Sequence, residues 1–486
     1  MRYNRVLLVS PPTSSYLGAA RPPQNLGYLA QALEDNGISY DVLDMRLARG
    51  VEQLYRKIEE YRPDLVGVSL VSLEYLRSYQ LIRGIKQEYP GLTVIAGGPH
   101  VTVTLERVME ECPELDYAVV HEGEGPLVDF CIGQIPVDSQ KGLIFRKEGK
   151  PVFNGHYPLS KELDSISWPK YTKFELDKYI PEMPFNSSRG CPHKCVFCPN
   201  KMITKKFRWR SPENVVDEIE YWYRKGYRIF NYDDDNFGYF PDRVYRICEE
   251  IERRSITGAE FRCSNGLRAD KVDRPLLKRM REVGFNYIAF GVDGGNNKML
   301  TLNKKGETIE QIEHAIKIAC ELDFDVKIFV ITGMPGETRE DIEDSLDLVM
   351  RYPIKRVLLN NPIPYPGTEL YDTVMENDWF ITQPEVYLNS VTEDESEPVF
   401  TTPELSYEDR VDILRTCRSV EKQITRNAIY RMYRKFGPLA RLAGYLFASA
   451  RVQRMFFMNM MFRRIAERVR FKRMQKKRVI AVSDTV

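Results

Sequence analysis

Short apolar runs alternate with amphipathic stretches along the first 135 residues of the chain. Apolar runs of this length are typical of strands buried on both faces, and apolar residues at helical spacing are typical of helices that cover a sheet. The predicted strands are 5–10, 40–45, 65–71, 93–98 and 116–123, and the helices between them include 25–37, 51–63 and 78–91. This order predicts an α/β region built on a doubly wound, Rossmann-like parallel sheet.

The carboxyl ends of these predicted strands carry small or polar residues. Ligands of doubly wound sheets bind at that edge, so it is the predicted ligand site of this region. The residues that the pattern places there include Pro12, Ser69, Ser72, Gly97, Gly98, Pro99, His100, Glu122, Gly123 and Glu124.

The alternation stops between about residues 136 and 180, where the sequence predicts irregular structure, and resumes afterwards. The second series has predicted strands at 228–237, 259–270, 286–295, 326–338 and 355–368. Ser211 before Pro212, and Thr308 with Gln311, have the chemistry of helix starts. About six strand–helix units with polar strand ends predict a partial (β/α)6 or complete parallel barrel with its site at that end.

We therefore predict four regions. They are a Rossmann-like domain at 1–138, a linker at 139–180, a barrel at 181–400, and a helical C-terminal region at 401–486 that ends in a basic, amphipathic tail.

The composition of the chain is that of a globular protein, with 43% hydrophobic and 29% charged residues. Nine cysteines over 486 residues are an odd number with a single cluster, which favours a reducing compartment and a metal or redox site over a disulfide framework. The N-terminal apolar run is too short for a signal peptide, and no run is long enough to cross a membrane. We expect a cytoplasmic protein.

The net charge of +1 conceals an asymmetry between the C-terminal region and the rest of the chain. Residues 425–478 hold 16 Lys and Arg against one acid, which leaves 54 basic and 68 acidic residues elsewhere. Because Leu, Phe and Met alternate with Arg in this tail, an anionic membrane surface suits it better than nucleic acid. A helical cap that packs on the acidic body explains the tail equally well.

The stretch "RGCPHKCVFCPN" places Cys191, Cys195 and Cys198 within eight residues. Thiolates at this density bind soft metals. A structural zinc needs a fourth ligand, for which His193 is badly placed, and a disulfide does not suit the compartment. An iron–sulfur cluster is therefore favoured over zinc, and with three cysteines one of its irons would keep a position for an outside ligand.

The C-x₃-C-x₂-C spacing, with Phe197 before the third cysteine and a barrel that starts at this loop, resembles the radical SAM superfamily. The resemblance implies a [4Fe–4S] cluster held by the three cysteines, which are both its metal ligands and the catalytic residues. It also implies that the open iron chelates S-adenosylmethionine (SAM), whose reductive cleavage yields a 5′-deoxyadenosyl radical. An external electron donor of the flavodoxin or ferredoxin type is then required.

Motifs along the barrel agree with this family in order and spacing. "NYDDDNF", "CSNGLRAD", "FGVDGG" and "ITGMPGET" resemble its SAM-binding strand ends. Asp293 stands where the family commonly has a glutamate. The SAM contacts that the resemblance implies are Phe197, Asp233, Asp234, Asn265, Arg268, Asp293, Gly333 and Gly336.

The first region resembles the cobalamin-binding domain of the B12-dependent, class B branch of this superfamily, in "PP…NLGYLAQAL", "AGGPHVT" and "HEGEGPLVDF". Together the two resemblances cover about residues 3–370. The strand-end residues named above, with Leu26 and Gly27, become the implied cobalamin contacts. "PPTSSYLG" lacks the histidine of an Asp-x-His-x-x-Gly motif, so no lower axial histidine is expected.

The resemblance implies most directly an enzyme that methylates an unactivated carbon of a small or lipid-like substrate. Radical cyclisation or rearrangement without methyl transfer is the alternative, and a cobalamin- or SAM-binding sensor without turnover is a third interpretation. The expected partners are the substrate, the electron donor and, for the tail, an anionic membrane surface that would make the protein peripheral. No nucleic acid is expected.

Overall fold

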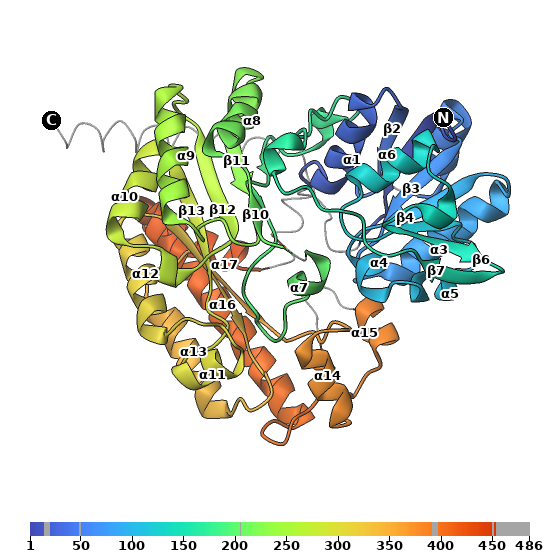
Figure 1. The fold of residues 1–486 in the computed structure, drawn as a ribbon. Coiled ribbons are helices and arrows are strands. Elements are labelled where there is room, and N and C mark those ends of the chain that lie inside the picture. The colour runs from blue at the N-terminus through green and yellow to red at the C-terminus, as the bar shows by residue number, and fades with distance from the viewer. Residues whose placement is uncertain (14–19, 48–49, 205, 391–396, 450–451, 453–486) are drawn as a thin grey trace.

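The computed structural model describes residues 1–13, 20–47, 50–204, 206–390, 397–449 and 452. Two α/β bodies lie side by side in it, each built on its own sheet (Figure 1). The strongly basic part of the predicted tail, from residue 453 onward, lies outside the described residues.

The first sheet has seven strands in the order β2-β1-β3-β4-β5-β6-β7. Its strands are β1 (Arg5–Ser10), β2 (Ser39–Asp44), β3 (Leu65–Ser69), β4 (Thr93–Gly97), β5 (Tyr117–Val119), β6 (Leu143–Lys147) and β7 (Lys150–Phe153). The first five strands are parallel, which confirms the prediction for this region. Apolar cores on both faces of the sheet explain why the strands are apolar throughout.

Helices cover this sheet on both faces. They are α1 (Gln24–Asp35), α2 (Glu52–Tyr61), α3 (Tyr75–Glu88), α4 (Pro99–Thr104), α5 (Arg107–Glu111) and α6 (Glu124–Ile132). Leu26 of α1 and Phe130 of α6 belong to one core, whereas Leu54 of α2 and Ile82 of α3 belong to the other.

The expectation of irregular structure after residue 136 is wrong for residues 143–153. These residues form the antiparallel hairpin of β6 and β7, which extends the sheet beyond β5. Glu148 and Gly149 at its turn have φ of 51° and 81°, as a tight hairpin turn requires.

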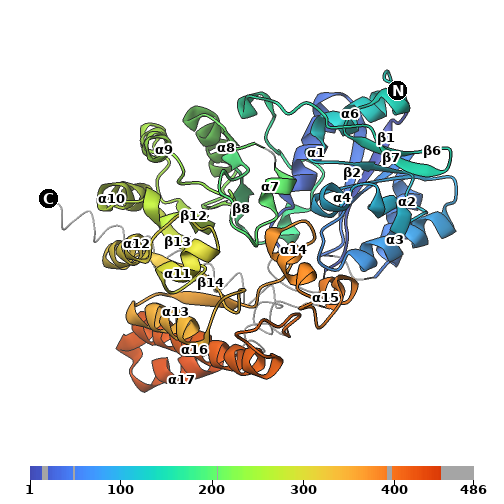
Figure 2. The same cartoon turned by 60° about the horizontal axis from the view of Figure 1, so that its bottom comes forward.

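The second sheet is fully parallel, with the order β15-β14-β13-β12-β11-β8. Its strands are β8 (Met183–Phe185), β11 (Ile229–Tyr232), β12 (Glu260–Leu267), β13 (Phe285–Gly291), β14 (Asp325–Ile331) and β15 (Arg356–Asn360). Six strands with helices on the outer side confirm the predicted partial barrel (Figure 2).

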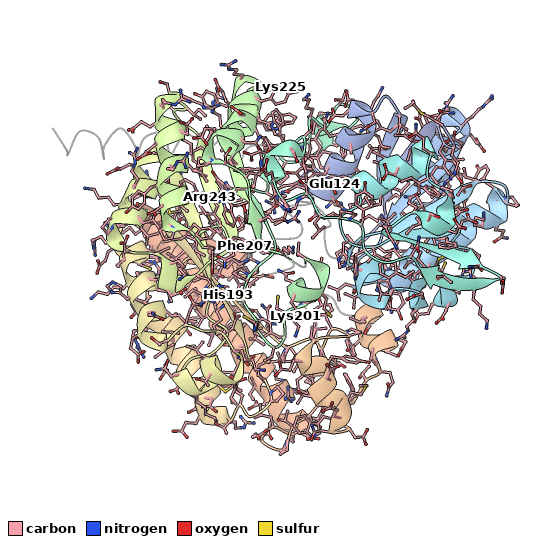
Figure 3. The ribbon with its side chains drawn as sticks, viewed as in Figure 1. Glu124, His193, Lys201, Phe207, Lys225 and Arg243 are labelled. Carbon is pink, nitrogen blue, oxygen red and sulfur yellow. The ribbon has the colours of Figure 1, made fainter. Side chains whose placement is uncertain are left out.

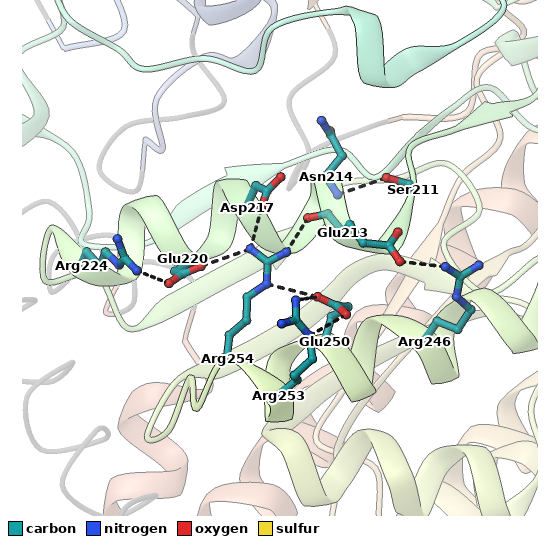
Figure 4. A network of polar contacts seen from close by, with 10 residues as sticks. All are labelled: Ser211, Glu213, Asn214, Asp217, Glu220, Arg224, Arg246, Glu250, Arg253 and Arg254. Carbon is teal, nitrogen blue, oxygen red and sulfur yellow. Dashed lines mark hydrogen bonds and ion pairs between the residues drawn. The ribbon is translucent and has the colours of Figure 1, made fainter.

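The outer helices of this barrel are α8 (Pro212–Arg224), α9 (Pro241–Arg253), α10 (Arg274–Val283), α11 (Asn297–Leu302), α12 (Ile309–Glu321) and α13 (Arg339–Arg351). Ser211 caps α8 by accepting a hydrogen bond from the Asn214 amide, and Thr308 with Gln311 forms the predicted capping box of α12. Arg254 joins α9 to Asp217 and Glu220 of α8 on the outer surface (Figure 4).

The remaining elements connect the two bodies or cover the barrel. They are β9 (Ser188–Arg189), α7 (Asn200–Ile203), β10 (Arg208–Trp209), α14 (Glu369–Glu376), α15 (Pro384–Ser390), α16 (Tyr407–Tyr433) and α17 (Pro438–Phe447). The chain returns to the first body at α15, where the Leu388 carbonyl accepts a hydrogen bond from the Glu74 amide. No helix in the described part of the chain is long and apolar enough to cross a membrane.

Candidate functional site

The three predicted cysteine ligands lie together on the loop between β9 and α7. All three thiols are free and half-buried, and the Cys198 amide donates to the Cys195 carbonyl, which folds the loop tightly. Burial raises the pKa of each thiol, that of Cys198 to about 11, so their thiolates need a compensating positive charge. Three thiolates on one loop are the soft ligands that an iron–sulfur cluster requires.

Neighbouring side chains do not complete a mononuclear site around these thiols. The His193 ring packs against the Tyr239 ring, with centroids 5.8 Å apart, and burial with nearby Arg268 lowers its pKa to about 4. In the ranges that the structure describes, no three His, Cys, Asp or Glu side chains converge closely enough to ligate one metal ion. The other six cysteines are on other elements, from the end of α5 to α16.

Asp234 anchors the strand that leads into the cysteine loop. Its carboxylate accepts hydrogen bonds from the Ser187 amide at 3.1 Å, from the Ser187 hydroxyl at 2.8 Å, and from the Ser188 hydroxyl. Arg243 donates to the Ser187 carbonyl at 2.6 Å on the same strand. Because Asp234 is 1% exposed with both oxygens engaged, this geometry favours an internal role over the predicted contact with SAM.

The two acids on either side of Asp234 have different surroundings. Asp233 accepts hydrogen bonds from Arg21 at 2.9 Å and from Gln24 at 3.1 Å, so it joins the barrel to the first body. Burial raises its pKa to about 6 against the attraction of Arg21. Asp235, which we did not predict as a site residue, is exposed on the wall of the cavity described below. Desolvation raises its pKa, and hydrogen bonds with the Asn200 side chain and the Gly190 backbone oppose this shift. The run of three consecutive aspartates is the sequence signal from which Asp235 could have been predicted.

The predicted SAM contacts further along the barrel are held by internal partners. Asn265 donates to the backbone carbonyls of Asp233 and Asp234, both at 3.3 Å, and Arg268 donates to the Lys305 and Gly306 carbonyls. Phe197 is half-buried against the apolar core near Val196.

Asp293 forms a buried ion pair with Lys305, at 2.7 Å, and has a left-handed φ of 57°. Desolvation opposes the charge of Lys305, but the attraction of Asp293 prevails and raises its pKa. The Lys305 ammonium also lowers the pKa of the Cys195 thiol, which opposes part of the increase that burial causes. Lys305 was missed from sequence because nothing in "NKKGE" marks it as a site residue.

The "ITGMPGET" loop is organised by Glu337. Its buried carboxylate accepts hydrogen bonds from the amides of Gly333, at 2.5 Å, and Met334, at 2.8 Å. Gly333 and Gly336 have φ of 94° and 81°, which only glycine adopts without strain. The two predicted glycines therefore shape the loop, and Glu337 fixes it.

A cavity lies between the strand ends of the first sheet and the cysteine loop. Its empty volume, counted to its open mouth, is about 1230 Å³. Eight of the predicted cobalamin contacts line it, namely Leu26, Ser69, Gly97, Gly98, Pro99, Glu122, Gly123 and Glu124. Barrel residues Asn186, Ser188, Arg189, Gly190 and Asp235 line the same cavity.

Glycines form much of the cavity wall on the side of the first sheet. Gly98 has φ of 109°, and a Cβ there would lie 2.5 Å from the Leu70 carbonyl oxygen. Gly67, Gly97 and Gly123 line the same wall, which suits the close approach of a large flat ligand. The residues present therefore fit a corrin ring at this edge.

Four of the predicted cobalamin contacts are not among the residues that line the cavity: Pro12, Gly27, Ser72 and His100. Gly27 packs against Tyr171, where a Cβ would lie 2.6 Å from a ring carbon. His100 is buried, stacks on Tyr75 and hydrogen-bonds to the Tyr79 hydroxyl at 2.9 Å. Burial lowers its pKa to about 4. Gly27 and His100 therefore pack inside the first body, and their contacts with cobalamin stay predictions.

His121 is the histidine that reaches the cavity. It has a left-handed φ of 65°, and its Nδ1 lies 3.0 Å from the Ile203 carbonyl of α7. It is the first residue of the motif "HEGEGPLVDF", but it was not predicted as a contact.

Ion pairs join the two bodies beside the first cysteine. Arg189 pairs with Glu122 at 2.9 Å and with Glu124 at 2.6 Å, and its guanidinium lies over the Tyr28 ring at 4.7 Å. Burial raises the pKa of Glu124, but the Arg189 charge outweighs it and holds the pKa below its usual value. Figure 3 shows Glu124 on the first body and His193 on the barrel side of this junction.

A model of the radical SAM superfamily matches residues 185–349, and a model of the B12-binding domain matches residues 17–130. Residues 185–349 are thus a radical SAM domain and residues 17–130 a B12-binding domain, which confirms the resemblance drawn from the cysteine spacing and the strand-end motifs.

Two relatives and one solved structure illustrate the range of similar proteins. The chain is 29% identical over 401 residues to an uncharacterized methyltransferase, PH0819, of Pyrococcus horikoshii, covering 79% of this chain and 85% of the relative. It is 26% identical over 373 residues to the anaerobic magnesium-protoporphyrin IX monomethyl ester cyclase of Cereibacter sphaeroides, covering 73% and 60%. The structure of OxsB with aqua-cobalamin and S-adenosylmethionine has a TM-score of 0.74 at 16% identity, covers 94% of this chain and 72% of OxsB, and shows the common fold.

These findings make the chain a cobalamin-dependent radical SAM enzyme with methyltransferase-like relatives. The predicted cofactors, a [4Fe–4S] cluster, SAM and cobalamin, are those of this family and agree with the thiol loop and the glycine-lined cavity.

Proposed function

We propose that this enzyme transfers a methyl group to an unactivated carbon of a small or lipid-like substrate. The observation that carries the proposal is one cavity that is lined by strand ends of the B12-binding domain and, on the barrel side, by residues next to the cysteine loop, from Ser188 to Gly190 and Asp235. When bound, the cluster and SAM supply a carbon-centred radical and cobalamin supplies a methyl group. A substrate in this cavity would be within reach of both. The methyltransferase relative supports this reaction class.

The chain's own residues have distinct roles in this proposal. Cys191, Cys195 and Cys198 hold the cluster. Asp235, on the cavity wall, suits the cationic sulfonium and amino group of SAM, because carboxylates bind such groups by charge-assisted hydrogen bonds. Arg189 acts as a positioning residue that holds the two cofactor regions in register through Glu122 and Glu124.

Two pairs of barrel residues build the walls of the SAM site in this proposal: Asp293 with Lys305, and Glu337 with Gly333. The eight residues of the first body that line the cavity hold the corrin. We further propose that the protein works in the cytoplasm and receives electrons from a flavodoxin- or ferredoxin-type donor.

The test is anaerobic reconstitution with iron, sulfide, cobalamin, SAM and a chemical reductant, in the presence of a cell extract as the substrate source. The proposal predicts that S-adenosylhomocysteine and 5′-deoxyadenosine form together. A sensor without turnover would form neither product, so the absence of both would refute catalysis.

Radical cyclisation or rearrangement is the second candidate, and the cyclase relative favours it. In the same experiment this reaction gives 5′-deoxyadenosine without stoichiometric S-adenosylhomocysteine. That outcome would replace methyl transfer with the second candidate.

A further inference from the structure

The short helix α17 turns its bulky apolar residues away from the protein. Leu439, Leu442 and Leu446 are 68%, 57% and 51% exposed, and Tyr445 is 63% exposed. Their spacing of three and four residues places the three leucines on one face of the helix. In an ordinary surface helix that face would be buried.

The opposite face of α17 explains this orientation. Ala440 and Gly444 are buried there against α16, and a Cβ on Gly444 would lie 3.2 Å from the Arg426 carbonyl oxygen. Small residues allow the two helices to approach closely, so α17 is fixed with its leucines outward. Phe436, in the turn before the helix, is also 51% exposed. A contiguous exposed apolar face of this kind marks an interaction site.

Cations without acidic partners flank this face. Arg434, Lys435 and Arg441 lie on the same turn and helix, and none of them has an ion pair within the described residues. Lys435 lies over the Phe436 ring and Arg441 over the Tyr430 ring. The sequence has no acid between Glu421 and Glu467, so this part of the chain is apolar and positive at once.

We propose that the apolar face of α17, defined by Leu439, Leu442, Tyr445 and Leu446, docks on an anionic lipid surface. Leucine and tyrosine side chains would enter the boundary between headgroups and acyl chains, while Arg434, Lys435 and Arg441 contact lipid phosphates. This proposal is independent of the reaction proposed above, because α17 contributes no residue to the cavity between the two bodies.

Charge decides between a lipid surface and the other occupants. A second copy of the chain would bring the same unpaired cations together across a symmetric contact, which is unfavourable. The segment 450–486 carries 11 Lys and Arg against two acids, so it does not complement the charge of α17 either. Anionic lipid complements both the apolar face and its cationic border.

The test is co-sedimentation of the full-length protein with vesicles of phosphatidylcholine alone or of phosphatidylcholine with phosphatidylglycerol. The wild-type protein should pellet with the anionic vesicles and less so as salt is raised, because salt screens the cations. The Leu442→Glu/Leu446→Glu variant should partition about a hundredfold more weakly, since two leucines lose their burial. Arg434→Gln with Lys435→Gln should weaken binding about tenfold or more.

The matched control is Met375→Glu with Val386→Glu, two exposed apolar residues on α14 and α15 that are 53% and 56% exposed. It should bind vesicles as the wild type does, and all variants should keep the wild-type thermal midpoint because the changed residues are at the surface. Equal binding by the Leu442→Glu/Leu446→Glu variant and the wild type would overturn the proposal. A dimer in sedimentation velocity that this variant dissociates, without a change in vesicle binding, would assign the face to a second copy instead.

Discussion

The first sheet and the barrel use the carboxyl ends of their strands differently. On the first sheet, small residues such as Gly97 and Gly98 leave room for a ligand. On the barrel, the polar strand-end residues Asp234, Asp293 and Glu337 are engaged by partners within the chain. Buried charges need internal partners even before a ligand binds, so the polar strand ends of the barrel support loops of the chain in addition to the SAM contacts that we propose.

The largest effect should come from Cys195→Ala, which removes one of three cluster ligands. We expect no iron–sulfur absorbance and no 5′-deoxyadenosine after anaerobic reconstitution, because the loop has no spare thiol. Cobalamin binding, followed by its own absorbance, should persist, because the first sheet forms its edge independently. Cys320→Ala, on α12, is the matched control and should keep the cluster. Loss of cobalamin binding in the Cys195→Ala variant would show that the cobalamin site and the cluster site do not form independently.

The junction between the two ends is tested by Arg189→Met. This change leaves Glu124 partly buried beside a neutral side chain, and removing one partner of such a pair costs about 3 kcal/mol. Arg246→Met breaks the exposed pair with Glu213 and should cost less than about 1 kcal/mol. Urea denaturation of both variants measures the difference, and equal losses would mean that the junction contributes no more than a surface ion pair.

The role of Glu337 in supporting its loop should be visible in the pH dependence of stability against unfolding. Burial raises the pKa of Glu337 to about 7, from 4.5 when the chain is unfolded. Between these values the folded state keeps a proton that the unfolded state has lost, so stability falls as the pH rises through this window and levels off above it. Because Glu337→Gln cannot titrate, its stability relative to the wild type should increase by up to roughly 3 kcal/mol from pH 4.5 to 7.5. Denaturation midpoints across this range measure it, and a constant difference would contradict the shifted pKa.

The smallest expected effects come from substitutions that distinguish the roles of Asp234 and Asp235. Asp234→Asn places an amide donor against the donors of Ser187 and Ser188 and should cost about 2 kcal/mol, with little effect on SAM affinity. Asp235→Asn should leave the thermal midpoint nearly unchanged and weaken SAM binding in equilibrium dialysis. The reverse pattern would exchange the roles assigned to the two residues.

The architecture was predictable because apolar runs and helical spacing determine which elements form and in which order. The hairpin at 143–153 escaped prediction because its strands are short and carry Lys and Arg, although "KEGK" contains the residues of a tight turn. The position of the three cysteines on one loop was predictable from their spacing, and their role as cluster ligands stays a prediction.

The direction of each side chain was less predictable. His100 follows a strand end as the sequence indicates, but it turns inward to Tyr79 as α4 begins. Arg189 and Lys305 gain their roles from partners distant in sequence, and no local pattern encodes such pairs.

We propose that the cavity between the two sheets holds cobalamin beside an iron–sulfur cluster on the cysteine loop. Anomalous scattering from crystals of the reconstituted enzyme, recorded at the iron and cobalt absorption edges, would locate both metals. We expect iron at Cys191, Cys195 and Cys198, and cobalt in the cavity lined by Gly97, Gly98 and Glu124. Cobalt outside that cavity, or iron away from the three cysteines, would contradict it.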